Sequence, residues 1–248
     1  YVAQTLRFPL PWMIGPMLLT AAYGIIHGAP PVRWFYRPVG QIVVATSVGL
    51  AFTQEALGEL VTHGIFMLAG AFLTIAAGYV AALVLIRLAR TDGTTAFFAS
   101  MPGGPVEMAN MAERFGVNGG PVALAQSLRI AGIVLVIAPI LLWSQGALGL
   151  GLRRIDGPVS VPGLIGLYAA GIAAAMLLKR FRIANPFFLG PVLIGAILTS
   201  SGQAHTVVPL PLLSAGQVLL GLSLGSRFDR QRLGHAGPFL LAAALSTA

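Results

Sequence analysis

The chain has 248 residues, of which 56% are hydrophobic and 9% charged, and its mean hydropathy is +0.86. A soluble domain carries about 25% charged residues, so this composition excludes soluble enzymes and DNA-binding modules and indicates a membrane protein. The 15 Lys and Arg residues outnumber the 7 Asp and Glu residues, and the absence of Cys excludes disulfides, thiolate metal sites and Cys nucleophiles.

The first part of the chain contains two interrupted apolar segments and one long, uninterrupted one. Residues 1–6 resemble the end of a missing helix and not a signal peptide, because no basic region precedes an apolar run. Segments 10–27 and 38–54 each contain an internal Gly or Pro, which predicts kinked or broken helices. Segment 64–86 is uncharged and long enough for a helix to cross about 30 Å of hydrocarbon.

Residues 91–116 mix apolar and polar groups around a breaker, MPGGP at residues 101–105. Thr94 or Thr95 is expected to cap a short helix that ends inside the breaker, at its Met. The Gly-Pro that closes the breaker is expected to begin a second helix, which ends near Gly116. Neither helix is long enough to cross a bilayer. The segment is therefore either one broken crossing or a re-entrant hairpin whose tip dips into the membrane.

Two long and two interrupted apolar segments follow. Segment 121–143 carries a single charge, Arg129, and segment 158–178 carries none. Segments Pro186–Ser200 and 206–226 are shorter and contain internal Gly or Pro, like those near the start of the chain. We therefore expect an all-α polytopic membrane protein that combines whole helices with broken ones.

The distribution of basic residues distinguishes the two alternatives for residues 91–116. If these residues re-enter, eleven Lys and Arg residues lie on one side of the membrane and three on the other, whereas a full crossing divides them six against eight. Basic residues accumulate in cytoplasmic loops, so this rule favours the re-entrant hairpin. The residues assigned to the cytoplasmic side are Arg33, Arg37, Arg87, Arg90, Arg114, Lys179, Arg180, Arg182, Arg227, Arg230 and Arg232.

Residues 7–60 and 182–236 resemble one another and predict an internal repeat. With a re-entrant hairpin between them, the two copies face opposite ways. The charges at the ends of the two copies support this orientation. The first copy ends in Glu55 and Glu59 and the second in three Arg residues, and basic ends lie on the cytoplasmic side. The alternative is that the shared residues reflect composition, since Gly and Pro are common in membrane helices. The matched residues are Pro11, Gly15, Pro16, Leu18, Gly40, Gln41, Ser47, Gly49, Phe52, Leu57 and Gly58 in the first copy and Pro186, Gly190, Pro191, Leu193, Gly216, Gln217, Ser223, Gly225, Phe228, Leu233 and Gly234 in the second.

The predicted organisation is a single membrane domain, residues 1–248, built as an inverted-repeat helical bundle with broken helices and a re-entrant Pro-Gly-Gly hairpin. Repeat one covers residues 1–145 and lacks its first helix, and residues 146–157 form a linker. Repeat two covers residues 158–248 and lacks its C-terminal part. Paired Gly/Pro-interrupted segments in two inverted halves are typical of a secondary transporter with its site near the midplane of the bilayer.

Four motifs resemble the AbrB family of bacterial integral membrane proteins. They are PWMIGP at residues 11–16, MPGGPVEM at residues 101–108 after Thr-Ala at 95–96, QSLR at residues 126–129 and NPFFLGP at residues 185–191. Members of that family carry a tandem duplication and are labelled as ammonia monooxygenases or as AbrB-type regulators. The resemblance covers nearly the whole chain, and we expect roughly 100 further residues of a complete repeat pair, including a second Pro-Gly-Gly loop, to lie outside the given sequence.

The residues themselves support neither family label. A copper or iron oxygenase needs clustered His or carboxylate ligands, and a regulator that touches DNA needs a soluble basic module. We therefore expect no metal site and no cofactor. The family also looks architecturally like inverted-repeat antiporters and organic-anion symporters, by analogy of fold. The His residues are scattered among different loops, at His27, His63, His205 and His235.

Arg129 is the only ionisable side chain well inside a clean crossing, where its insertion costs about 2.5–3.5 kcal/mol. It is expected either to hold an anionic substrate or to pair with a carboxylate that is released during transport. The structural alternative is a permanent ion pair or a contact with the carbonyls of a broken helix. Gln126 lies three residues earlier on the same helical face and is expected to line the same cavity.

Glu107 occupies the third position of the second half-helix, where free N–H groups and the positive end of the dipole favour negative charge. It either caps this half-helix, or binds a proton or cation, or is the mobile partner of Arg129. Asn110 shares its face. Gly103 and Gly104 either let the backbone approach a ligand closely or only make the turn.

Gln41 and Gln217 are equivalent in the predicted repeat, so each is expected to face the interface between the repeats. The structural alternative for both residues is a hydrogen bond between neighbouring helices.

The function expected from these features is alternating-access transport of a small, anionic solute across the bacterial inner membrane, with H⁺ or Na⁺ as the coupling ion where transport is coupled. The expected partners are the lipid bilayer, the solute and a second copy of the chain, without nucleic acid. The alternatives are a membrane-bound monooxygenase-type enzyme, as one family label implies, and a membrane-embedded regulatory protein without transport.

Overall fold

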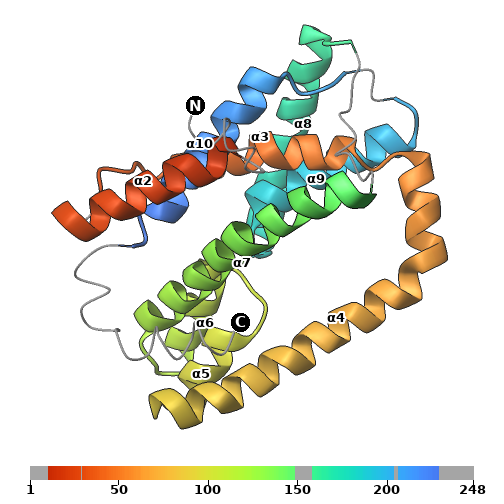
Figure 1. The fold of residues 1–248 in the computed structure, drawn as a ribbon. Helices are drawn as coiled ribbons and strands as arrows, with labels where there is room; N and C mark the ends of the chain where they lie inside the picture. The colour runs from red at the N-terminus through yellow and green to blue at the C-terminus, as the bar shows by residue number, and fades with distance from the viewer. Residues whose placement is uncertain (1–10, 29, 149–157, 204–205, 229–248) are drawn as a thin grey trace. The chain divides into compact units, whose positions relative to one another are not determined.

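The structure is a computed structural model that describes residues 11–28, 30–148, 158–203 and 206–228. Within these residues it contains α-helices and no β-strand (Figure 1). The expected all-α class is therefore confirmed. The helices are α2 (Pro11–His27), α3 (Tyr36–Leu50), α4 (Gln54–Ala89), α5 (Gly93–Ser100), α6 (Pro105–Arg114), α7 (Gly119–Leu148), α8 (Val161–Arg180), α9 (Pro186–Ser200) and α10 (Leu210–Gly225).

Segments 64–86 and 121–143 lie within α4 and α7, and segment 158–178 begins three residues before α8 and otherwise lies within it. Among the described residues, α4 and α8 are long and apolar enough to cross a membrane, and α9 and α10 are shorter apolar helices. Segment 38–54 was predicted too long, because α3 ends at Leu50 and α4 begins at Gln54. Most of the predicted linker, residues 149–157, lies outside the described residues. Further crossings and the inverted repeat stay predictions.

The chain divides into two compact units. Unit 1 comprises Tyr1–Met17, Val32–Gly64 and Leu142–Ser223, and unit 2 comprises Leu18–Pro31, Ile65–Leu141 and Leu224–Ala248.

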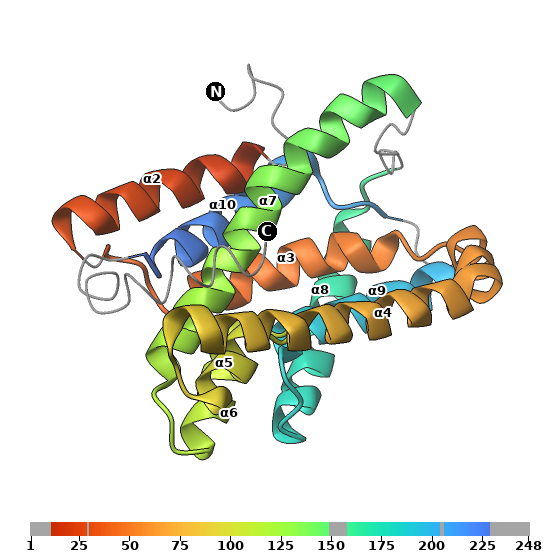
Figure 2. The same cartoon turned by 60° about the horizontal axis from the view of Figure 1, so that its bottom comes forward.

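In unit 1, α3, α8 and α9 pack together (Figures 1 and 2). Gln41 in α3 contacts Asn185 at the start of α9, and Gly49 near the end of α3 contacts Gly195 further along α9, so the two helices run parallel. At Gly49 a Cβ atom would lie 2.7 Å from the Val192 carbonyl oxygen and 3.0 Å from the Gly195 Cα. The two backbones therefore touch without intervening side chains.

Helix α8 runs antiparallel to α9. Ala175 near its end lies against Gly190, where a Cβ would meet the Ala175 backbone nitrogen at 2.5 Å. At the other end, the backbone N–H of Ser160 donates to Thr206 Oγ1 at 3.1 Å. The end of α8 and the starts of α3 and α9 therefore lie at one end of this three-helix group.

Helices α3 and α10 also meet at glycines in unit 1. A Cβ at Gly40 would lie 2.8 Å from the Gly216 carbonyl oxygen and 2.9 Å from Leu220 Cγ, and a Cβ at Gly216 would lie 2.7 Å from Val43 Cγ1. The contacts run in reverse order along the two helices, which is the pattern of an antiparallel crossing. Gly40 and Gly216 are also the residues that the sequence comparison matched to one another.

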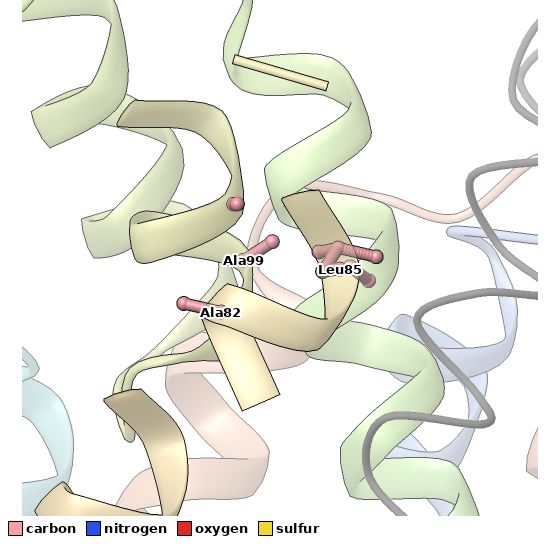
Figure 3. Close-up of a cluster of buried hydrophobic side chains, with 5 residues drawn as sticks. Ala82, Leu85 and Ala99 are labelled. Carbon is pink, nitrogen blue, oxygen red and sulfur yellow. The ribbon is translucent and has the colours of Figure 1, made fainter. Parts of the chain in front are cut away.

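In unit 2, the second half of α4 packs against α5 and α7. Ala82 and Leu85 of α4, Ala96 and Ala99 of α5 and Ala125 of α7 form one buried apolar cluster, three of whose members are labelled in Figure 3. Small side chains at most of these positions let the helix axes approach closely. The short helix α5 is thereby held by its neighbours, since a helix of its length is not stable alone.

The predicted break at residues 101–105 is confirmed, because α5 ends at Ser100 and α6 begins at Pro105. The predicted cap was wrong. Asp92, and not a Thr, is the N-cap of α5, and its carboxylate accepts a hydrogen bond from the Thr95 N–H at 2.7 Å. Thr95 is three residues inside the helix, where its own backbone donor needs an acceptor.

We expect Asp92→Ala to lower the free energy of unfolding by about 1 kcal/mol at neutral pH through loss of this cap. Burial tends to raise the pKa of Asp92, but the hydrogen bonds from Thr95 and Thr94 outweigh it and the pKa is lowered. A lowered pKa stabilises the fold above the carboxyl's ordinary value near 3.9, and this contribution is lost as the pH falls through the lowered value. Asp92→Asn, which cannot titrate, should therefore lose less stability than the native protein between pH 7 and pH 3 in thermal melts of the purified protein.

We expect Gly49→Ala to destabilise the protein by about 1–3 kcal/mol, because the added methyl group overlaps the backbone of α9. Gly166→Ala in α8 is the matched control, since no atom lies within 4 Å of its Cβ position, and it should leave the protein unchanged or slightly more stable. The two thermal midpoints compare the effects. Equal effects would show that α3 and α9 do not touch at Gly49.

Candidate functional site

The break between α5 and α6 leaves main-chain carbonyl groups without partners inside α5, as every helix end does. Gln126 in α7 reaches two of them, since its Nε2 donates to the Phe98 oxygen and to the Met101 oxygen, both at 2.7 Å. The Gln126 side chain is completely buried. A buried carbonyl without a hydrogen bond is costly, so Gln126 stabilises the end of α5.

Arg129 lies one helical turn further along α7 and also donates to carbonyl oxygens at the break between α5 and α6. Its Nη1 donates to the Ser100 oxygen at 2.6 Å, and its Nη2 donates to the Met101 oxygen at 3.1 Å and to Gln126 Oε1 at 2.6 Å. The guanidinium therefore lies at the C-terminal end of α5, where the helix dipole is negative. This is the contact with broken-helix carbonyls that the sequence allowed as the structural alternative.

The acceptors around Arg129 in the part of the chain that the structure describes are all neutral oxygens. No Asp or Glu among the described residues forms an ion pair with it, and its Nε proton and one Nη1 proton make no hydrogen bond to a described residue. The helix dipole offsets roughly half an elementary charge. Among the described residues, the guanidinium is thus stabilised by neutral acceptors and by the dipole of α5, and by no carboxylate.

Glu107 folds back over the start of its own helix. A Cβ at Gly104 would overlap Glu107 Oε2 and lie 2.9 Å from Glu107 Cδ. The carboxylate thus lies beside the N-terminal end of α6, where negative charge is favourable, as expected if Glu107 caps this half-helix. Gly104 is the N-cap residue, and its missing side chain makes room for Glu107.

Gly103 and Asn110 are the other predicted site residues of this segment. A Cβ at Gly103 would lie 2.6 Å from Met108 Cε, so the space beside Gly103 is filled by Met108 of the following helix. Asn110 is exposed on α6. The structure therefore brings Gln126 and Arg129 together at the end of α5, and Glu107, Gly103 and Gly104 together at the start of α6.

Gln41 and Gln217 belong to unit 1 and differ from one another. The Nε2 of Gln41 donates to Asn185 Oδ1 at 2.7 Å, which joins α3 to the N-cap residue of α9. Asn185 has the left-handed backbone conformation, with φ of 56°, which Asn adopts more readily than most residues. Gln217 is half-buried in α10 and makes no hydrogen bond to a described residue.

Sequence reasoning missed three groups that these sites use. The carbonyls of Phe98 and Ser100 carry no signal in a one-letter sequence. Asn185 has one, because Asn before Pro is typical of a turn that begins a helix. In the part of the chain that the structure describes, no three His, Asp or Glu residues lie close enough together to hold a metal ion.

Comparison with known proteins places the chain in one family. Residues 3–248 match the family described as "Transition state regulatory protein AbrB". The chain is 28% identical over 246 residues to "Uncharacterized protein YhjN" of Bacillus subtilis, covering 87% of this chain and 62% of that protein. It is 26% identical over 237 residues to "Putative regulator AbrB" of Escherichia coli, covering 92% of this chain and 66% of that protein. No solved structure matches.

We expect Gln126→Leu to destabilise the protein by about 1–3 kcal/mol, because the Phe98 carbonyl loses its donor and stays buried. Ser127→Ala is the matched control. Ser127 is also completely buried, but its hydroxyl donates to the Ala123 oxygen of its own helix at 2.7 Å, so its removal should cost much less. Thermal unfolding of both variants measures the difference, and an equally large loss for Ser127→Ala would contradict the role assigned to Gln126.

Proposed function

The chain belongs to the AbrB family, and we propose that it is a multi-pass protein of the bacterial inner membrane that moves a small anionic solute by alternating access. The observation that carries this proposal is the guanidinium of Arg129, held at the end of a broken helix by neutral oxygens. The chain spans 62% and 66% of the length of the two relatives, so the proposal concerns the complete protein.

The exposure of α4 supports a membrane location. Residues 58–77 contain no buried residue on any face of the helix, and large apolar side chains such as Phe66 and Leu73 are exposed by 73% and 72%. At about 1.5 Å per residue this stretch is about 30 Å long, which is the thickness of the hydrocarbon core. Water is a poor solvent for such a surface, whereas lipid suits it.

The two threonines of this exposed stretch also suit lipid, and its ionisable residues, Glu59 and His63, lie in its first two turns and contact one another at 3.2 Å. Thr62 Oγ1 donates to the Gly58 oxygen at 2.9 Å and Thr74 Oγ1 donates to the Gly70 oxygen at 2.8 Å. Each hydroxyl proton is thus bonded within the helix. In hydrocarbon no water is present to accept it.

An anion is the solute class that the chemistry of Arg129 favours. An arginine well inside a membrane helix is costly and is retained where it has a partner or a function. Its planar guanidinium has paired N–H groups that suit a carboxylate or a phosphate. Because its present acceptors are neutral, an anion would add the missing negative charge without displacing another acid.

Alternating access is supported by the crossing of α3 and α10. In an inverted repeat, equivalent helices run in opposite directions, and equivalent residues near the two-fold axis contact one another. Gly40 and Gly216 are matched in the sequence and adjacent at an antiparallel crossing, which are the two properties expected of that axis. We also propose that transport is coupled to the movement of H⁺ or Na⁺ and that the Glu107 carboxylate binds this ion.

The proposal is tested on the full-length protein, purified in neutral detergent and reconstituted in liposomes. A panel of small organic anions should include at least one that raises the thermal midpoint of the native protein and is taken up by the liposomes. Arg129→Gln should abolish both effects. Arg129→Lys keeps the charge but not the paired geometry, and we expect its apparent affinity to fall by about tenfold or more.

Ser127→Ala serves as the control, because this neighbour bonds only within its own helix. An anion response that survives in Arg129→Gln would contradict the assigned role of Arg129. Recovery of the native protein from the soluble fraction would contradict the membrane location.

A further inference from the structure

One end of unit 1 carries a cluster of basic side chains. The start of α3, the end of α8 and the start of α9 lie at this end, because Gln41 bonds Asn185 at 2.7 Å and Ala175 packs against Gly190. Arg37 lies one helical turn before Gln41 on the same face of α3. The residues of this basic end are Arg33, Arg37, Lys179, Arg180 and Arg182.

The acids of unit 1 lie away from this basic end. Its described residues contain Glu55 and Glu59 as their only Asp or Glu side chains. Both follow Gln54, whose Nε2 donates to the Ser200 oxygen at the opposite end of α9, at 3.1 Å. The two acids thus lie near the other end of the α3–α8–α9 group from Lys179, Arg180 and Arg182, within the part of unit 1 that the structure describes.

The backbone at the end of α8 holds Arg182 in a conformation that disfavours a side chain. The Arg182 N–H donates to the Lys179 oxygen at 3.0 Å and the Ile183 N–H donates to the Leu178 oxygen at 3.0 Å. This pair of hydrogen bonds is the Schellman motif, which places one residue in the left-handed conformation and strongly favours Gly there. Arg182 occupies that position with φ of 56°.

Two other helices end in the same motif and use glycine. Gly116 after α6 has φ of 79° and Gly202 after α9 has φ of 72°, with the same pair of hydrogen bonds in each case. The fold thus accepts Gly at this position, and a side chain is disfavoured there by the backbone. Arg182 keeps its side chain at a backbone cost, as Arg90 after α4 does, but Arg182 belongs to the basic end of unit 1 and Arg90 belongs to unit 2.

Apolar side chains are exposed at the basic end. Trp34 is exposed by 86%, Phe181 by 68% and Ile183 by 41%. The Lys179 ammonium lies 5.7 Å from the centre of the Phe187 ring, which holds one cation against the surface. Aromatic and basic residues side by side are the combination that suits the headgroup region of a bilayer.

We propose that this basic end binds the phosphate of an anionic phospholipid, with Arg182 as the residue retained for that contact. The inference rests on the membrane location proposed above. A phospholipid fits better than free phosphate, because Trp34, Phe181 and Ile183 offer apolar contacts that only a lipid can use. Lys179 and Arg180, in the last turn of α8, complement both the headgroup and the helix dipole.

The test uses the full-length protein in neutral detergent, with the thermal midpoint measured during titration with short-chain phosphatidylglycerol, short-chain phosphatidylcholine or inorganic phosphate. The native protein should be stabilised selectively by phosphatidylglycerol. Arg182→Gly should raise the midpoint without lipid by about 2–4 °C, since the backbone preference is satisfied. It should also require about fivefold more phosphatidylglycerol for the same shift.

Arg90→Gly is the matched control. Arg90 ends α4 with a left-handed backbone as well, with φ of 48°, but it lies in unit 2, two residues before Asp92. It should show a similar gain without lipid and an unchanged response to phosphatidylglycerol.

Three results would overturn the lipid site. The first is an Arg182→Gly variant whose thermal midpoint rises with phosphatidylglycerol as much as that of the native protein. The second and third are a native midpoint that rises with inorganic phosphate, or with phosphatidylcholine, as much as with phosphatidylglycerol. If the protein is recovered with membranes and one of these results is found, the lipid site alone fails. If it is recovered from the soluble fraction, the membrane location fails and the lipid site with it.

Discussion

The capture of the α5 carbonyls by Gln126 and Arg129 is the interaction on which the arrangement of unit 2 depends. A helix that stops at Ser100 in buried surroundings leaves carbonyl oxygens that water cannot reach. Two side chains one turn apart on α7 supply the missing donors. The break and the arginine therefore depend on one another. The guanidinium supplies donors to the carbonyls at the end of α5, and these carbonyls supply acceptors to the guanidinium.

Unit 1 is organised by a different constraint, which is backbone contact at glycines. Gly49 against Gly195 and Gly40 against Gly216 bring helices together with almost no side chain between them. In the membrane location proposed above, apolar side chains would contribute little to helix association, because lipid is as apolar as they are. Close backbone packing supplies van der Waals contact between these helices, and the hydrogen bond from Gln41 to Asn185 adds a polar contact.

The sequence predicted those features that depend on local chemistry. The break at residues 101–105 follows from two Pro and two Gly residues in a row, and the long helices follow from uninterrupted apolar runs. The cap of α5 was assigned wrongly because Asp92, Thr94 and Thr95 all have capping side chains, and only the backbone geometry selects among them. The acceptors of Arg129 could not be chosen either, since main-chain carbonyls are common to every residue.

The way in which Arg129 is stabilised bears on how it would bind an anion. A guanidinium paired with a carboxylate must release that acid before it can take another, which costs as much as the first pair gained. Arg129 instead keeps its carbonyl contacts and has two N–H groups that bond no described residue. In the proposed function, an anion arriving there would complete the charge balance while the end of α5 stays in place, so ordering the site would add little to the cost of binding.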